Sequence, residues 1–303
     1  MGRIPMIGGT TLLFGANSLS GWALLQRRGF ASLEPHCNRN SRLPQHLDWG
    51  RVNLQDRQAL ADVLAKHRPD RIIDCSGICR VETCERSPDF AFEVNVVGVR
   101  NLLDLLPEQT HLIYCSNDHV FGGGNGPYGE SSPPTPINIY GKTRAIAETD
   151  IRRLRPDALI LRIGVLVGGS HNRRRGDIDW MRYRTAHRLP ITYVTDERRN
   201  VAWSADVADR IAELAEKRTS GIRHIVGRQT LSRVTLAEYL NERFDIGARF
   251  VRQRRNQRSF PHPGHIELVT EFRDELATPL PAVMPEPSDT WIPHSNATPT
   301  RGG

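Results

Sequence analysis

Short apolar segments alternate with amphipathic segments along the first half of the chain. The apolar stretch 11–14 ends at a glycine and is followed by a helical pattern over residues 19–28. The same alternation then continues, with expected strands at 71–75, 111–115 and 158–162 and expected helices at 56–66, 90–106 and 137–154. Strands and helices in this order form parallel βαβ units with helices on both faces of a sheet. The pattern predicts an α/β fold, a Rossmann-type doubly wound parallel sheet.

The segment 15–21 joins the first expected strand to the first expected helix. Turns that bind a pyrophosphate need Gly15 for a tight bend, a small residue at Ser18 for close approach, and Gly21 for helix–strand packing. Ser18 stands where the usual pattern has a second glycine. Free N–H groups at a helix start bind anions. We therefore predict a dinucleotide-binding turn, with an ordinary glycine-containing turn as the alternative.

The segment Asn38-Arg39-Asn40-Ser41-Arg42 follows the expected end of the second strand. An acidic residue there would bind a ribose 2′-hydroxyl, whereas an arginine suits a 2′-phosphate. Residues 37–43 contain no acid. The sequence therefore favours NADP over NAD, while a basic surface loop is the other interpretation.

Charge and cysteine usage narrow the classes of partner. The net charge of +7 is carried mostly by arginine, which binds phosphate through a planar fork, so a phosphorylated or nucleotide-linked small molecule fits the chain. The basic runs 173–175 and 252–258 are short and lack interleaved aromatic residues, which disfavours nucleic acid. We expect the first run to be solvated loop surface, with contact to a substrate diphosphate as the alternative. The five cysteines have neither disulfide-framework nor zinc spacing, so no metal is expected.

Hydropathy gives no sign of a membrane segment. The mean hydropathy is −0.46, and no apolar run approaches the roughly 18–20 residues that span a bilayer. The N-terminus lacks the apolar stretch and cleavage site of a secretory signal. We therefore expect a cytoplasmic protein.

Three ordered segments carry a more specific resemblance, namely 115–122 (CSNDHVFG), 127–130 (PYGE) and 136–143 (PINIYGKT). They resemble the dTDP-4-dehydrorhamnose reductase family, within the extended short-chain dehydrogenase/reductases, and the resemblance covers most of residues 11–283. It also takes in a non-enzymatic relative, the NADP-binding regulatory β-subunit of methionine adenosyltransferase. Residues 39–42 and 52–56 look particularly similar to that subunit.

The resemblance implies a catalytic group with altered positions. In this family a tyrosine donates a proton to the carbonyl oxygen of a 4-keto sugar while a nicotinamide delivers hydride. Tyr140 occupies the tyrosine position, but the position one helical turn on is Arg144 instead of the family's lysine. Asn117 replaces a hydroxyl residue that hydrogen-bonds the substrate carbonyl, and an amide can also donate there. His119 replaces the family's second tyrosine.

The resemblance also implies binding residues and a division into domains. The expected cofactor contacts are Gly15, Asn17, Ser18, Leu19, Gly21, Asn38, Arg39, Cys75, Ser76, Gly77, Asn95, Tyr140 and Arg144. The expected substrate contacts are Cys79, Asp118, His119, Trp203 and Arg258. We expect an NADP-binding domain at 10–168 to which 200–227 returns, a smaller α/β substrate-binding domain made of 169–199 and 228–284, and a disordered Pro-, Ser- and Thr-rich tail at 285–303.

Three hypotheses for function remain open. The leading one is an NADPH-dependent reductase of a nucleotide-activated 4-keto sugar or related carbonyl compound. The rival, favoured by Asn117 and Arg144, is a catalytically impaired NADP-binding subunit that regulates a partner enzyme. A third keeps catalysis but uses Asp118 or His119 as an acid or base on a different substrate. The sequence shows no interface signature, so a homodimer and a complex with a partner enzyme both stay open.

Overall fold

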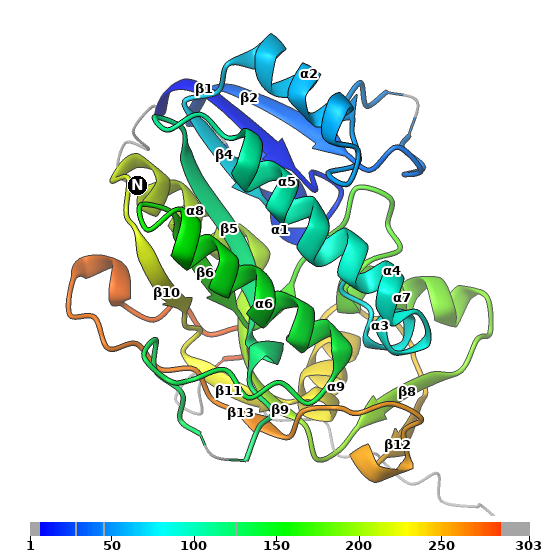
Figure 1. Ribbon diagram of the computed structural model, residues 1–303. Helices are drawn as coiled ribbons and strands as arrows, with labels where there is room; N and C mark the ends of the chain where they lie inside the picture. The colour runs from blue at the N-terminus through cyan, green and yellow to red at the C-terminus, as the bar shows by residue number, and fades with distance from the viewer. Residues whose placement is uncertain (1–6, 28, 45, 125, 286–303) are drawn as a thin grey trace, which may run out of the picture.

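A seven-stranded sheet forms the centre of the molecule (Figure 1). The computed structural model describes residues 7–27, 29–44, 46–124 and 126–285. The strand order is β10-β6-β5-β4-β1-β2-β3, and every pair is parallel. The strands are β1 (Ile7–Phe14), β2 (Phe30–Cys37), β3 (Gly50–Arg51), β4 (Arg71–Asp74), β5 (His111–Asn117), β6 (Leu159–Ile163) and β10 (Gly221–Ile225). The predicted doubly wound parallel sheet is confirmed.

Helices cover both faces of this sheet, as Figure 1 shows. One layer contains α1 (Leu19–Gln26) and α8 (Ser204–Glu216), and the other contains α2 (Arg57–His67), α5 (Gly98–Leu105) and α6 (Ile139–Leu154). Because side chains alternate along a strand, Leu13 and Ile73 pack into the first layer while Leu12 and Ile72 pack into the second. Burial on both faces explains why these strands are continuously apolar in the sequence.

The segment predicted as one helix over 90–106 is interrupted. It consists of α4 (Pro88–Phe92), the π-helical turn η1 (Glu93–Val97) and α5. Apolar periodicity continues through all three elements and does not reveal the change in hydrogen bonding. Such turns are rare and are often found at functional sites. This one carries Asn95, one of the expected cofactor contacts.

A second unit lies beyond the carboxyl ends of the central strands. Its four-stranded sheet contains β7 (Val165–Val167), β9 (Arg198–Trp203), β11 (Gln229–Ser232) and β13 (His265–Ile266), and a separate parallel pair joins β8 (Ile191–Val194) to β12 (Phe250–Gln253). The helices α7 (Gly176–Ala186) and α9 (Arg233–Arg243) pack against these strands. The assignment of this unit to substrate binding stays a prediction.

The chain returns from the second unit to the first. α8 packs against α1, and β10 pairs with β6 at the edge of the central sheet. In the described part of the chain, no helix combines the length and the apolar character that crossing a bilayer requires. Apart from residue 285, the predicted disordered tail lies outside the described residues.

Candidate functional site

The turn between β1 and α1 has the conformation that its glycines predict. Gly15 has φ +70°, where an L side chain is strained, and a Cβ atom there would lie 2.5 Å from the Ser76 nitrogen. A Cβ atom on Gly21 would lie 2.9 Å from the Ala16 α-carbon. Ser18 caps the helix, since its hydroxyl accepts a 3.0 Å hydrogen bond from the Gly21 N–H. The turn thus leaves the first N–H groups of α1 at the carboxyl end of β1, free of intrahelical partners.

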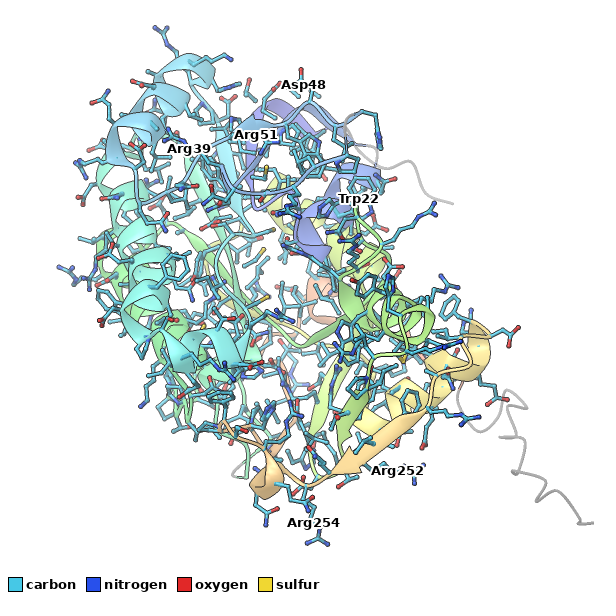
Figure 2. The ribbon with its side chains drawn as sticks, turned by 90° about the vertical axis from the view of Figure 1, so that its right-hand side faces the viewer. Trp22, Arg39, Asp48, Arg51, Arg252 and Arg254 are labelled. Carbon is cyan, nitrogen blue, oxygen red and sulfur yellow. The ribbon has the colours of Figure 1, made fainter. Side chains whose placement is uncertain are left out.

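The expected 2′-phosphate contact lies at the carboxyl end of β2. The guanidinium of Arg39 is half-exposed and forms a 2.8 Å ion pair with Asp56. Arg51, which sequence reasoning missed, lies beside it (Figure 2). Arg51 donates to the carbonyls of Arg39 and Ser41 at 3.1 and 2.8 Å, so it holds the loop in place. The short β3 gave no sequence signal that would have aligned Arg51 with Arg39.

The loop after β4 meets helix α6 through Asn95. The Asn95 oxygen accepts from the Ile78 N–H at 2.8 Å, and its amide nitrogen donates to Thr143 Oγ1 at 3.0 Å. Gly77 has φ +113°, and a Cβ atom there would lie 2.6 Å from that same Asn95 oxygen. The fold therefore brings the expected contacts at 75–77, Asn95 and α6 together at one edge of the sheet.

Arg144 is the charged centre of this edge. It is buried, and its guanidinium donates to the Ser76 carbonyl and the Tyr114 hydroxyl, both at 2.8 Å. Its central carbon lies 5.5 Å from the ring centroids of both Tyr114 and Tyr140. Burial raises the pKa of Tyr140, and the charge of Arg144 only partly opposes that rise. The Tyr140 phenol therefore holds its proton at neutral pH.

Tyr114 is a second residue that sequence reasoning missed. It lies on β5, is fully buried, and shares the guanidinium of Arg144 with Tyr140. Burial raises the pKa of Tyr114 to about 12, so its hydroxyl also stays protonated. The sequence showed only an apolar strand at this position.

The side-chain amide of Asn117 forms two hydrogen bonds with the protein backbone. Its oxygen accepts from the His119 N–H at 2.9 Å, and its nitrogen donates to the Ile163 carbonyl at 3.2 Å. A primary amide has two N–H donors, and this hydrogen bond uses one of them. The neighbouring Ser116 side chain bonds instead to the buried Glu148. Ser116 thus points to the opposite face of β5 from Asn117, as the alternation along a strand predicts, toward α6.

Asp118 and His119 belong to a buried charged cluster with Arg199. Both oxygens of the fully buried Asp118 accept hydrogen bonds from Arg199, which also pairs with Glu197 at 3.0 Å. Arg199 Nη1 lies 3.0 Å from His119 Nε2. The ring of His119 lies edge-on to the ring of Tyr140, with 5.3 Å between the ring centroids. Burial, together with the charge of Arg199, lowers the pKa of His119 well below its ordinary value. His119 is therefore neutral. Both oxygens of Asp118 are bonded to Arg199, which disfavours Asp118 as an acid or base.

The remaining expected substrate contacts lie on three separate segments of the chain. Cys79 is exposed on the loop after β4, and Arg258 is exposed just beyond the turn that follows β12. Trp203 lines a cavity of about 460 Å³ with Val167, Ile178 and Phe244. The residues that line this cavity do not include Tyr140. Neither Cys79 nor Arg258 is among the residues that line this cavity.

The comparisons with known proteins agree with this geometry. A family model described as the RmlD substrate binding domain matches residues 9–271. A probable dTDP-4,6-dihydroxy-2-methyloxan-3-one 4-ketoreductase of Streptomyces antibioticus is 31% identical over 249 residues, which are 81% of this chain and 77% of that protein. The dTDP-4-dehydrorhamnose reductase of Bacillus anthracis, solved in complex with NADP, has a TM-score of 0.74 and 21% identity, and the match covers 90% of this chain and 95% of that one.

A different kind of relative also matches. The methionine adenosyltransferase 2 subunit beta of Danio rerio is 36% identical over 132 residues, which are 44% of this chain and 40% of that protein. The chain spans between about a third and two thirds of the length of the first curated relatives it matches.

Proposed function

Because this chain belongs to the RmlD substrate-binding domain family, we propose that it is an NADPH-dependent reductase of a nucleotide-activated 4-keto sugar or a related carbonyl compound. The observation that carries the proposal is the placement of Tyr140. Its ring lies against the buried cation of Arg144, at the same sheet edge as the glycine turn. This placement supports Tyr140 as the proton donor to a carbonyl beside a dinucleotide held by that turn.

The residues present fit a dinucleotide. Gly15 lets the turn pack closely against the end of β4, and Gly21 lets α1 pack closely against the turn, since a Cβ atom at either position would overlap backbone atoms. The first N–H groups of α1 supply donors for a diphosphate, and Arg39 with Arg51 supplies positive charge for a 2′-phosphate. The bound cofactor would supply hydride. The two arginines favour NADP over NAD, and the Bacillus anthracis relative was solved with NADP.

Tyr140 supplies the proton in this reaction. Its phenol is protonated at neutral pH, and it transfers that proton to the carbonyl oxygen as the carbonyl carbon accepts hydride. The carbonyl becomes an alcohol, and the phenolate left on Tyr140 faces the guanidinium of Arg144. The central carbon of Arg144 lies 5.5 Å from the centroid of the Tyr140 ring, and an opposite charge this close stabilises the phenolate. Arg144 can therefore take over the electrostatic role of a lysine. Asn117 retains one N–H to polarise the carbonyl.

A regulatory subunit is the second candidate. Two observations favour it: the similarity to the methionine adenosyltransferase subunit, and the commitment of Arg144 to Ser76 and Tyr114. Under this hypothesis the chain binds NADP and a partner enzyme without turnover. The cofactor site is the same in both cases.

The two candidates are separated by titrating NADPH into the purified protein and then following absorbance of the reduced nicotinamide with dTDP-4-keto-6-deoxy sugars. Loss of absorbance that depends on the sugar nucleotide supports the reductase. Tight NADPH binding without turnover across a panel of such substrates supports the regulatory subunit. A protein that binds no NADPH would contradict both.

A further inference from the structure

The loop 168–175, which leads into α7, lies against the glycine turn although more than 150 residues separate them. A Cβ atom on Gly176 would lie 3.0 Å from a δ-carbon of Leu19, the first residue of α1. Arg175 donates from Nη1 to the carbonyl of Asn17 at 3.1 Å. The end of the loop thus meets the turn at Asn17 and α1 at Leu19.

The loop is held by its own contacts. The buried Ser170 hydroxyl accepts from the backbone N–H groups of Arg174 and Arg175, at 3.2 and 3.1 Å, and donates to Asp179 at 2.8 Å. His171 packs against Trp49 and against Trp22 of α1, with ring centroids 5.8 and 6.3 Å apart (Figure 2 labels Trp22). The position of Arg175 at the turn is therefore built into the fold.

The guanidinium of Arg175 retains capacity for an anion. It is exposed, and its bond to the Asn17 carbonyl uses one of five N–H donors. The free N–H groups of α1 begin two residues after Asn17, so a diphosphate bound there lies within reach of this side chain. A guanidinium forms paired hydrogen bonds with phosphate oxygens.

We propose that Arg175, a residue of the second unit, binds the cofactor diphosphate beside the start of α1, so that the cofactor adds a bridge between the loop 168–175 and the turn. The inference rests on the proposed NADP site and adds a contact that the expected cofactor residues did not include. It also revises the interpretation of run 173–175 as solvated surface, since one of the three arginines has a specific position.

The test compares the dissociation constants of NADPH and NADH, measured by fluorescence of the reduced nicotinamide at low salt. The Arg175→Ala change is expected to raise both dissociation constants, because both cofactors carry the diphosphate. The rise is expected to be about tenfold, because the arginine is solvent-exposed. Arg39→Ala is expected to weaken the binding of NADPH but not that of NADH, because only NADPH has the 2′-phosphate. Arg175→Lys should recover part of the loss for both.

Arg174 supplies the matched control. It belongs to the same loop and carries the same charge, but its guanidinium lies 5.1 Å from the ring centroid of Tyr183 on α7. Arg174→Ala is expected to leave both dissociation constants within about twofold of wild type, which separates a specific contact from a general loss of charge. A thermal melt of each variant checks that the fold is intact.

The outcomes distinguish this inference from the function on which it rests. Wild-type protein that binds neither NADPH nor NADH would overturn both. Wild-type protein that binds NADPH, with Arg175→Ala at wild-type affinity, would overturn the inference alone. Equal losses in the Arg174 and Arg175 variants would overturn it too, since the effect would then be non-specific.

Discussion

Substitution of Gly15 by alanine tests the glycine turn most severely. The backbone of Gly15 has φ +70°, and an alanine held in this left-handed region costs about 1–2 kcal/mol. The new Cβ atom would also lie 2.5 Å from the Ser76 nitrogen and closer still to the Cys75 carbonyl, both of them backbone groups that cannot rotate away. Overpacking of this kind costs about 1–3 kcal/mol. Together the two effects predict a loss of about 2–5 kcal/mol in the free energy of unfolding.

The same change should weaken cofactor binding. Relief of the overlap must move the turn away from the end of β4, which displaces the N–H groups expected to bind the diphosphate. We expect the dissociation constant for NADPH to rise at least about tenfold, as measured by fluorescence titration, alongside urea unfolding for stability. Gly8→Ala is the matched control, because Gly8 lies on β1, the strand that leads into the turn, and a Cβ atom there meets no atom within 4 Å. A Gly15→Ala variant as stable and as tightly binding as Gly8→Ala would refute the reasoning.

Three further predictions concern charged groups. Arg51→Ala is expected to weaken NADPH binding more than NADH binding, because Arg51 holds the loop that carries the 2′-phosphate contact; equal losses for the two cofactors would count against it. Arg162→Leu should destabilise the protein by about 3–5 kcal/mol in thermal or urea unfolding, because it leaves the carboxylate of Glu148, now 2.8 Å from Arg162, buried and unpaired; a change below about 1 kcal/mol would contradict this. Burial raises the pKa of Glu197, but the hydrogen bond from His262 and the charge of nearby arginines outweigh burial and lower the pKa to about 2. Because this folded-state pKa lies below the ordinary value of 4.5, the stabilisation is complete above pH 4.5 and is lost as the pH falls toward about 2. Glu197→Gln should therefore flatten the dependence of unfolding free energy on pH in that window, and an unchanged slope would show that Glu197 does not titrate as described.

The parts of the site that the sequence predicted are those formed by neighbouring residues. The turn at 15–21 depends on the conformational freedom of Gly15 and on the cap supplied by Ser18, and both effects are local. The strands at 71–75 and 111–115 were predicted because burial on both faces makes them apolar throughout. The α/β fold followed from the order of these local patterns.

The parts that escaped prediction depend on contacts between distant segments. Asp118 looked like an available carboxylate until the fold paired it with Arg199, 81 residues away. Arg175 looked like surface charge until the loop before α7 brought it to Asn17, 158 residues away. Tyr114 looked like one more apolar strand residue, because nothing local shows that its hydroxyl meets Arg144. Charge, burial and partner are properties of the packed molecule, so residue type alone could not assign these roles.

The central claim, that Tyr140 gives its proton to a carbonyl reduced by a nicotinamide held at the glycine turn, is tested most directly by NADPH oxidation in the Tyr140→Phe variant. The measurement follows absorbance of the reduced nicotinamide with a dTDP-4-keto-6-deoxy sugar at neutral pH, with NADPH affinity determined in parallel. The account predicts an NADPH affinity within about twofold of wild type and a rate at least about 100-fold lower. A Tyr140→Phe variant that oxidises NADPH at the wild-type rate would contradict it.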